Sequence, residues 1–245
     1  MDIRRGSTVE GRVIRAFLLA LSDLGDRRIL AILGQALVIT AIIFAGIGAL
    51  LFWLLVGADP CGWIGLDTCP LDRTTGGVSA IVFMLLGAWF LFPGVAIGVV
   101  TGFADRIAAA VEQRHYPEAA AEARSIGVGR GIGMGLRSAV RLLLFNLLAL
   151  PFYLLLLVTG IGPFVLFVIV NGLAFGRDLG ELAAARHGDP ESRRAWLKRT
   201  RGEQHLMGTL ISVMFLVPFV NLIAPVVGTA MAIHLFARSV QPRSQ

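Results

Sequence analysis

Apolar residues fall in four long stretches, and polar, charge-bearing segments separate them. The first two stretches cover residues 27–56 and 78–103, and the apolar run of the first extends from Ile29 to Val56. About 20 apolar helical residues cross the ~30 Å hydrocarbon core of a bilayer. The pattern therefore predicts two full transmembrane helices at 27–56 and 78–103, joined by a loop at 57–77.

The other two stretches, 142–175 and 206–237, are each broken near the middle. Thr159-Gly160-Ile161-Gly162-Pro163 interrupts the first, and a segment with prolines at both ends, Pro218 to Pro225, interrupts the second. In the second stretch each arm has about 12 residues, or ~18 Å of helix, which is too short for a crossing, and the first stretch repeats this design. These stretches are predicted to be re-entrant hairpins that enter and leave the membrane on the same side.

The N-terminal segment 8–24 has the spacing of an amphipathic helix, with one apolar face made by Val9, Val13, Phe17, Ala20 and Leu24. Such a helix can lie in the headgroup plane or pack against a partner subunit. Further helices are predicted at 104–115, at 118–124 and, after a turn at Gly188-Asp189-Pro190, at 191–201. The alternating glycines from 127 to 135 are predicted to form a flexible linker, because no nucleotide-binding motif fits their spacing.

Composition places the chain in a membrane. Hydrophobic residues make up 56% of the 245 residues and charged residues 16%, whereas soluble domains have nearer 25% charged residues. The sequence therefore predicts an all-α integral membrane protein in contact with the lipid bilayer, with residues 1–245 forming one membrane domain.

The charges are distributed unevenly. The loop 57–77 carries Asp59, Asp67 and Asp72 against one basic residue, Arg73, and the other 21 of the 22 lysines and arginines lie elsewhere. By the positive-inside rule, this loop is external and both termini are cytoplasmic. The basic excess then orients the protein and requires no nucleic acid.

The only two cysteines, Cys61 and Cys69, fall in this external loop. An oxidising compartment favours a disulfide between them, and a metal site is the weaker alternative because no histidine is near.

Catalytic motifs are absent from the sequence. The four histidines show no ligand spacing, and neither an HExxH motif, a CxxC motif nor a GxSxG elbow occurs. The sequence predicts no enzyme, no cofactor and no metal.

A candidate anion site lies at Gly25-Asp26-Arg27-Arg28. A glycine turn that enters a helix offers backbone N–H groups to an anion, and two adjacent guanidinium groups suit a tetrahedral oxyanion. Topology alone also explains two arginines at the cytoplasmic end of a span. Asp26 opposes anion binding unless its side chain caps the helix and faces away.

Several of these features together resemble the CysZ-type sulfate permease family, which shares its membrane domain with etoposide-induced-protein-like proteins. The break at Thr159–Pro163 resembles the family's first glycine-proline break. Pro218–Pro225, followed by Gly228-Thr229-Ala230, resembles its second, and the arginine pair also occurs at the start of the first span. The resemblance covers roughly residues 10–238.

The resemblance implies a bacterial inner-membrane protein with two full spans and two hemi-penetrating hairpins, assembled as a homo-oligomer. It implies uptake of sulfate for cysteine synthesis, with Arg27 and Arg28 binding sulfate and Gly25 supplying backbone donors. It also implies that charged residues after the second span, Glu112 and Arg114 together with Arg106, lie near the permeation path. Three departures are Leu33-Gly34 in place of a proline, Ala109-Ala110 near a position that is acidic in relatives, and the external cysteine pair.

The leading hypothesis is therefore an oligomeric permease or channel for sulfate or a related oxyanion. The alternative is a non-transporting membrane scaffold of the same fold, in which the arginines only orient the chain.

Overall fold

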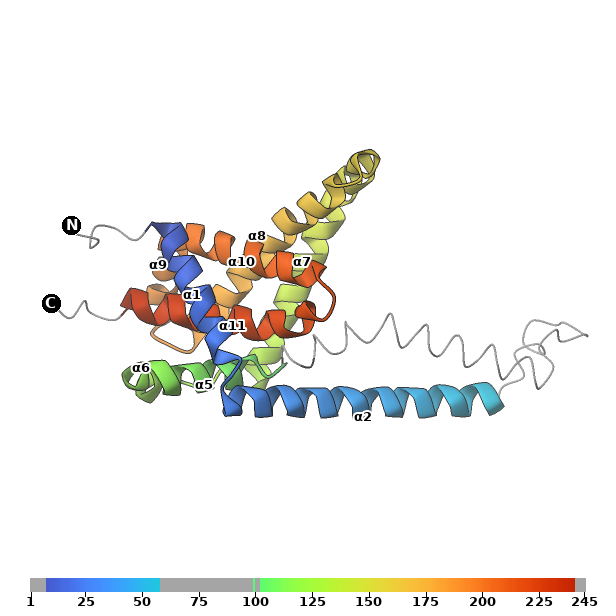
Figure 1. The fold of residues 1–245 in the computed structure, drawn as a ribbon, viewed down its shortest axis with the longest axis horizontal. Coiled ribbons are helices and arrows are strands. Elements are labelled where there is room, and N and C mark those ends of the chain that lie inside the picture. Colours follow the sequence, from blue (N-terminus) through green and yellow to red (C-terminus); the bar gives the residue numbers. More distant parts are fainter. Residues whose placement is uncertain (1–7, 58–98, 100–101, 241–245) are drawn as a thin grey trace, which may run out of the picture. The chain divides into compact units, whose positions relative to one another are not determined.

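The computed structural model describes residues 8–57, 99 and 102–240, and within these ranges it contains helices and no strand (Figure 1). The helices are α1 (Val9–Asp23), α2 (Arg27–Gly57), α5 (Ala104–His115), α6 (Pro117–Glu122), α7 (Val128–Leu156), α8 (Gly162–Ala185), α9 (Pro190–Arg199), α10 (Arg201–Leu216) and α11 (Val220–Val240), with a 3-10 turn η1 at Leu157–Thr159. The predicted all-α class is confirmed.

The chain divides into two compact units. The larger holds residues 1–32 and 100–245, and the other holds residues 33–99. Helix α2 begins in the first and continues into the second.

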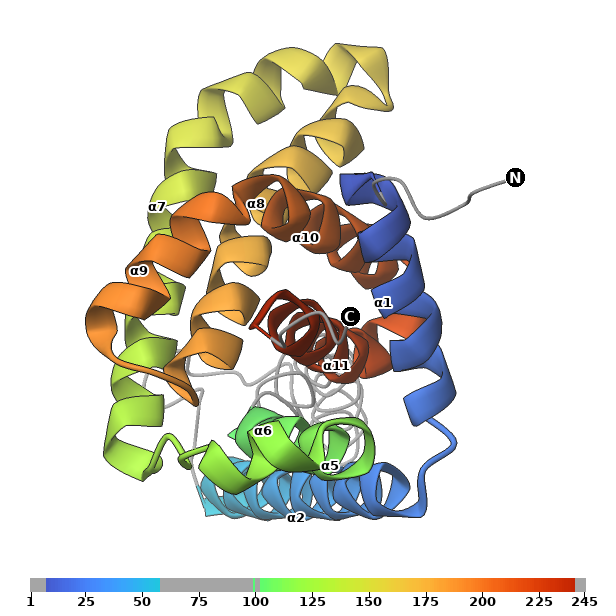
Figure 2. The same cartoon turned by 90° about the vertical axis from the view of Figure 1, so that its left-hand side faces the viewer.

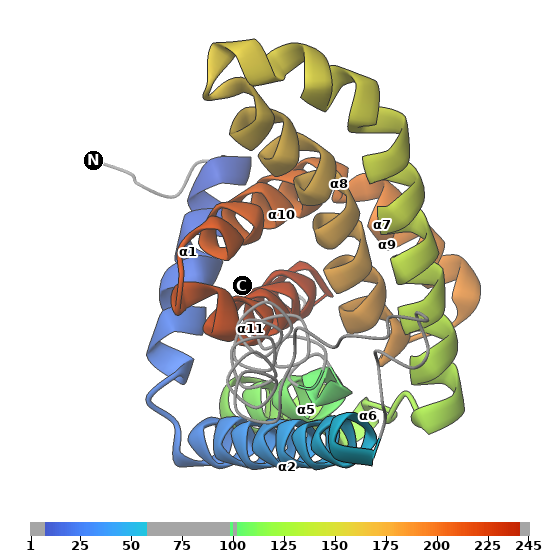
Figure 3. The ribbon, with the colours of Figure 1, turned by 90° about the vertical axis from the view of Figure 1, so that its right-hand side faces the viewer.

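Helix α11 is the centre of the larger unit. Helices α1, α5, α8 and α10 all pack against it, and Figures 2 and 3 show it enclosed by them from opposite directions. Every residue from Ala224 to Ala237 is buried. The second predicted hairpin thus contributes the core helix of this unit.

Helix α1 is amphipathic, as predicted, and it packs against its own chain. Thr8 caps it by accepting a hydrogen bond from the amide of Gly11 at 3.3 Å. Val13, Ala16 and Ala20 are buried, and the helix contacts α11 and α10. Its opposite side exposes Ile14, Leu18 and Leu21, a second apolar stripe that is open to lipid or to another subunit.

The first predicted helix break lies where the sequence places it. Helix α7 ends at Leu156, η1 follows, and α8 begins at Gly162. Gly160 adopts a φ of 70°, and the Thr159 hydroxyl accepts a hydrogen bond from the amide of Gly162 at 2.8 Å. Figure 1 shows α7 and α8 running together to this tip.

The arms of this hairpin are much longer than predicted. Helix α7 has 29 residues and α8 has 24, or about 43 and 36 Å. The prediction of a flexible linker at 127–135 is wrong, because all but Gly127 of that segment belongs to α7. Arg141 Nη1, in α7, pairs with Asp178 Oδ1, in α8, at 2.6 Å. The two helices therefore stay in contact beyond the apolar residues 142–175. The argument that the arms are too short to cross the membrane therefore does not apply to α7 and α8.

The second break is shorter than predicted. It comprises residues 217–219, where Phe219 adopts a φ of 65°, and Pro225 lies inside α11. Helix α10 has 16 residues, or about 24 Å, which is less than a hydrocarbon core. Helix α10 is therefore too short to cross the membrane, as predicted for the arms of this stretch.

Within the described residues, four helical stretches are long and apolar enough to cross a membrane: 27–50, 129–159, 162–185 and 220–240. The chain is a multi-pass membrane protein. The predicted span at 78–103 lies outside the described residues apart from residues 99, 102 and 103, and so does the predicted loop 57–77, with Cys61 and Cys69, after Gly57, which ends α2.

Helices α8 and α10 approach so closely that glycine is required at their contact. A Cβ on Gly176 would overlap the carbonyl oxygen of Gln204, and a Cβ on Gly208 would overlap the carbonyl oxygen of Gly172. Small residues permit this backbone-to-backbone packing between membrane helices.

A buried ion pair joins α5 to the end of α8. Glu112 is 1% exposed and accepts hydrogen bonds from Arg186 Nη2 at 2.7 Å and Nε at 3.0 Å, and its Oε1 lies 2.9 Å from His187 Nε2. Arg186 also pairs with Asp105. Burial raises the pKa of Glu112, but the hydrogen bonds from His187 and Arg186 outweigh burial, and the net pKa is lowered.

Gly208→Ala should lower the free energy of unfolding by about 1–3 kcal/mol, the usual cost of overpacking. Gly133→Ala is the matched control, because a Cβ at Gly133, in α7, meets no atom within 4 Å. Alanine there should leave stability unchanged or raise it. Thermal unfolding in detergent measures both. An equal melting temperature for the two variants would contradict the close approach of α8 and α10.

Arg186→Met should destabilise the protein by about 3–5 kcal/mol, because it removes the guanidinium that pairs with the buried Glu112 carboxylate and leaves His187 as its remaining partner. The double variant Glu112→Gln/Arg186→Met should lose clearly less free energy of unfolding, since it buries no charged member of this pair without the other. Equal losses in chemical denaturation would show that the pair is not coupled.

The same carboxylate makes stability depend on pH. The pKa of Glu112 in the folded protein lies below its ordinary value of 4.5. The stability that the ionised Glu112 contributes is therefore fully present above pH 4.5 and is lost as the pH falls through the lower pKa of the folded state. Acidification should therefore destabilise the wild type more than Glu112→Gln. Parallel melting curves at neutral and acidic pH test this, and identical pH profiles would refute it.

Candidate functional site

The turn between α1 and α2 presents two adjacent arginines. Arg27 and Arg28 are the first two residues of α2, and both are exposed. The turn before them, Leu24-Gly25-Asp26, brings the chain from the end of α1 into α2. The predicted site thus has its arginines at a helix N-terminus, where the helix dipole favours an anion.

Asp26 caps α2. Its Oδ1 accepts a hydrogen bond from the amide of Arg28 at 2.7 Å, and its Oδ2 accepts one from Arg114 Nη1 at 3.2 Å. The carboxylate is therefore bound to the helix and to α5. Because its side chain caps the helix in this way, Asp26 is compatible with an anion bound at the arginines.

The backbone amides of the turn have internal acceptors. The Gly25 N–H donates to the carbonyl oxygen of Ser22 at 3.3 Å, and the Asp26 N–H donates to that of Asp23 at 2.9 Å. The structure therefore does not present Gly25 as an open donor, contrary to expectation. Recognition at this turn must depend mainly on the guanidinium groups.

The two guanidinium groups differ in their surroundings. Arg28 Nη1 donates to Gln113 Oε1, on α5, at 2.7 Å. Within the described part of the chain, the Arg27 side chain has no hydrogen-bond or ion-pair partner. Arg28 is thus oriented by α5, and Arg27 projects into solvent at the same turn.

The three predicted path residues do not share one face of α5. Glu112 is held in the buried ion pair described above, whereas Arg106 and Arg114 are exposed. At about 100° per residue, Arg106 and Arg114 are ~80° apart around the helix, and Glu112 lies on the other side. Arg106 also stacks on the Phe103 ring at 5.1 Å.

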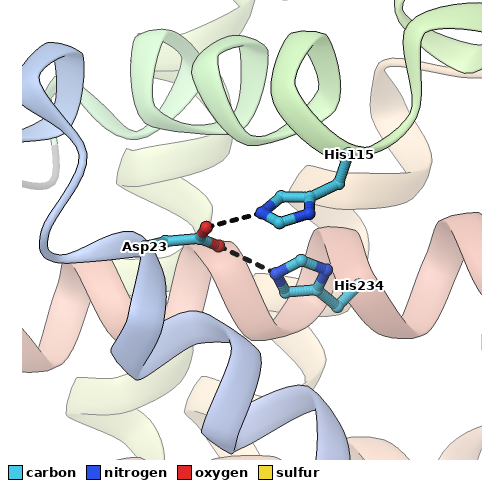
Figure 4. Close-up of side chains that lie close together, drawn as sticks. All are labelled: Asp23, His115 and His234. Carbon is cyan, nitrogen blue, oxygen red and sulfur yellow. Dashed lines mark hydrogen bonds and ion pairs between the residues drawn. The ribbon is translucent and has the colours of Figure 1, made fainter.

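Behind the arginine turn lies a buried polar cluster made by Asp23, His115 and His234, shown in Figure 4. Asp23 Oδ1 lies 2.7 Å from His115 Nε2, and Asp23 Oδ2 lies 2.8 Å from His234 Nε2. The side chains of Asp23 and His234 are 1% and 0% exposed, and that of His115 is 26% exposed. Burial raises the pKa of Asp23, yet the hydrogen bonds to His234 and His115 outweigh it and lower the net pKa.

Further groups surround this cluster. The Tyr116 hydroxyl lies 3.0 Å from His234 Nδ1 and accepts a hydrogen bond from Arg238 Nε at 3.3 Å. Arg114 Nη1 lies 3.5 Å from Asp23 Oδ1, so it links the cluster to Asp26. One ligand-type atom from each of Asp23, His115 and His234 lies within 4.8 Å of the others.

The sequence did not predict this cluster. Its members are 92 and 211 residues apart, and no spacing rule connects them. The one available signal was local: Asp23 ends an amphipathic helix, and His234 lies in an otherwise apolar run, where an ionisable residue indicates a buried partner.

The sequence profile of one family, described as sulfate transporter CysZ/etoposide-induced protein 2.4, matches residues 16–225. No curated protein and no solved structure matches the chain. The family match covers both helix breaks and the arginine turn. The chain therefore belongs to the sulfate transporter CysZ/etoposide-induced protein 2.4 family, and its role is that of a membrane transporter.

Proposed function

We propose that this protein is a permease or channel for sulfate or a related oxyanion in the inner membrane of a bacterium, where it supplies sulfur assimilation. The charge distribution supports a cytoplasmic position for both termini. The observation that carries the proposal is the exposed pair Arg27 and Arg28 at the start of α2, with Asp26 turned onto the helix and Arg114.

The chemistry of this turn favours a tetrahedral oxyanion. Guanidinium groups donate several charge-assisted hydrogen bonds in a fixed geometry, and the N-terminus of α2 adds a partial positive charge. Gln113 holds Arg28 in place, so part of the ordering cost is met before the anion binds. Arg106 and Arg114, on the same side of α5, extend the positive surface, and Glu112 serves to hold α5 to α8.

The proposed assembly is a homo-oligomer. One chain has only a few helices with which to enclose a path, and α7 carries a row of exposed apolar side chains: Leu136, Leu143, Leu147, Leu148 and Leu154. Lipid or a second subunit must cover such a surface. The proposed path lies within or between subunits, next to the arginine turn.

A sulfate dianion moves inward against an inside-negative membrane potential. The cost is about 2.3 kcal/mol per charge for each 100 mV, so about twice that for sulfate. Net uptake therefore needs an ion gradient or rapid consumption of sulfate in the cytoplasm.

Sulfate binding to the purified protein tests the site. Arg27→Ala/Arg28→Ala should weaken binding by about tenfold or more, because each charge-assisted hydrogen bond contributes about 1.5–3 kcal/mol and exposure reduces that contribution. Arg194→Ala/Arg199→Ala on α9 removes the same charge from exposed positions and should bind as the wild type does. Equal affinity in all three proteins would remove Arg27 and Arg28 from the site.

Radiolabelled sulfate flux into proteoliposomes separates transport from a scaffold role. The wild type should carry sulfate faster than empty vesicles, and competing oxyanions of similar size should reduce the flux. Flux equal to that of empty vesicles would favour the non-transporting scaffold.

A further inference from the structure

The cluster of Asp23, His115 and His234 joins the ends or interiors of three helices. Asp23 is the last residue of α1, His115 is the last of α5, and His234 lies within α11. All three side chains point toward a common centre (Figure 4). Two imidazoles and one carboxylate thus converge from three segments that are distant in the sequence.

We propose that these three side chains bind a divalent first-row transition metal ion, with Zn²⁺ as the reference ion. Two imidazole nitrogens and one carboxylate oxygen are a ligand set that zinc, cobalt and nickel accept. Three protein ligands leave a fourth tetrahedral position for water. This proposal does not depend on sulfate transport.

The geometry needs only a small adjustment. Ligand bonds of about 2.0–2.2 Å in a tetrahedral site place ligand atoms roughly 3.3–3.5 Å apart. His115 Nε2 lies 2.7 Å from Asp23 Oδ1, and His234 Nε2 lies 2.8 Å from Asp23 Oδ2, so each ring faces its own carboxylate oxygen. One ligand atom from each of the three residues lies within 4.8 Å of the others. Side-chain rotations that separate each hydrogen-bonded nitrogen–oxygen pair by roughly 0.5–0.8 Å bring these atoms to the spacing of a tetrahedral site.

The surroundings already hold the ligands in the required orientation. When a histidine binds a metal through one nitrogen, its other nitrogen usually donates to a fixed acceptor. Tyr116 provides that acceptor for His234 Nδ1 at 3.0 Å, and Arg238 in turn donates to the Tyr116 oxygen. The ring is thereby turned so that Nε2 faces Asp23.

The charges around the centre are balanced for a cation. Arg114 is the nearest positive group, 3.5 Å from Asp23 Oδ1, and it is paired with Asp26 at 3.2 Å. Asp23, Asp26 and Arg114 together carry one negative charge. Arg238 contacts the cluster through the Tyr116 hydroxyl and not through a ligand atom. The histidines bind as neutral ligands. His115 is the most exposed of the three ligands, which gives the ion a route from the surface.

A purely hydrogen-bonded cluster is the competing arrangement. In it, both Nε2 atoms carry protons and donate to Asp23, and no metal is needed. The two arrangements differ in one measurable respect, because only the first creates a stoichiometric site whose spectrum reports imidazole ligands.

The direct experiment is a Co²⁺ titration of the full chain in detergent, after chelation of bound metal and removal of any purification tag. Wild-type protein should show the visible absorption of tetrahedral Co²⁺, saturating at one ion per chain, and Zn²⁺ should displace it. His115→Gln should weaken binding by more than about 100-fold, since even outer ligands contribute 10- to 100-fold. Tyr116→Phe should weaken it by about tenfold.

His205→Gln is the matched control, because His205 is exposed on α10 and lies outside the cluster. It should bind Co²⁺ as the wild type does. Unchanged affinity in His115→Gln, or no saturable binding by the wild type, would overturn the proposal.

X-ray absorption at the zinc edge of the wild type provides a test that needs no variant. Two imidazole ligands and oxygen ligands are expected, and a bound zinc without imidazole neighbours would also overturn the proposal. Sulfate binding measured on the same samples, with and without metal, keeps this result separate from the transport hypothesis.

Discussion

Within the described residues, the buried carboxylates of Glu112 and Asp23 are each reached by a partner of opposite charge or by hydrogen-bonding groups. Burying an isolated ion costs several kcal/mol, and pairing offsets that cost only with good geometry. Glu112 with Arg186, and Asp23 with two histidines, satisfy the requirement. Both sets join segments that are distant in sequence, so the arrangement of α1, α5, α8 and α11 depends on them.

This constraint also explains why α11 can be the core helix although it carries a histidine. Its small residues allow neighbouring helices to approach, and His234 is matched by Asp23, at the end of α1, and by Tyr116, between α5 and α6. The polar contacts therefore define which helices lie beside α11 and in which register. Apolar packing alone would allow several alternatives, because it is not directional.

The sequence predicted the features that local chemistry determines. Glycine and proline fixed the hairpin tip at Thr159–Pro163, and apolar spacing predicted α1. It misplaced features that depend on tertiary contacts: the glycine-rich start of α7 is helical, and Gly25 does not present an open amide. The Asp23 cluster was invisible to spacing rules, because its three residues meet only after the chain has folded.

The glycine contact between α8 and α10 has a mechanical consequence. Where two backbones touch without intervening side chains, rotation or sliding of one helix against the other brings carbonyl groups and Cα atoms into collision. Helices α8 and α10 must consequently move together as one rigid body. A conformational change that admits and releases a solute must therefore occur at other helices. Helix α7 is the least buried of the candidate spans, and Gly160 lies in the turn after it, so α7 is the part of the larger unit best suited to move.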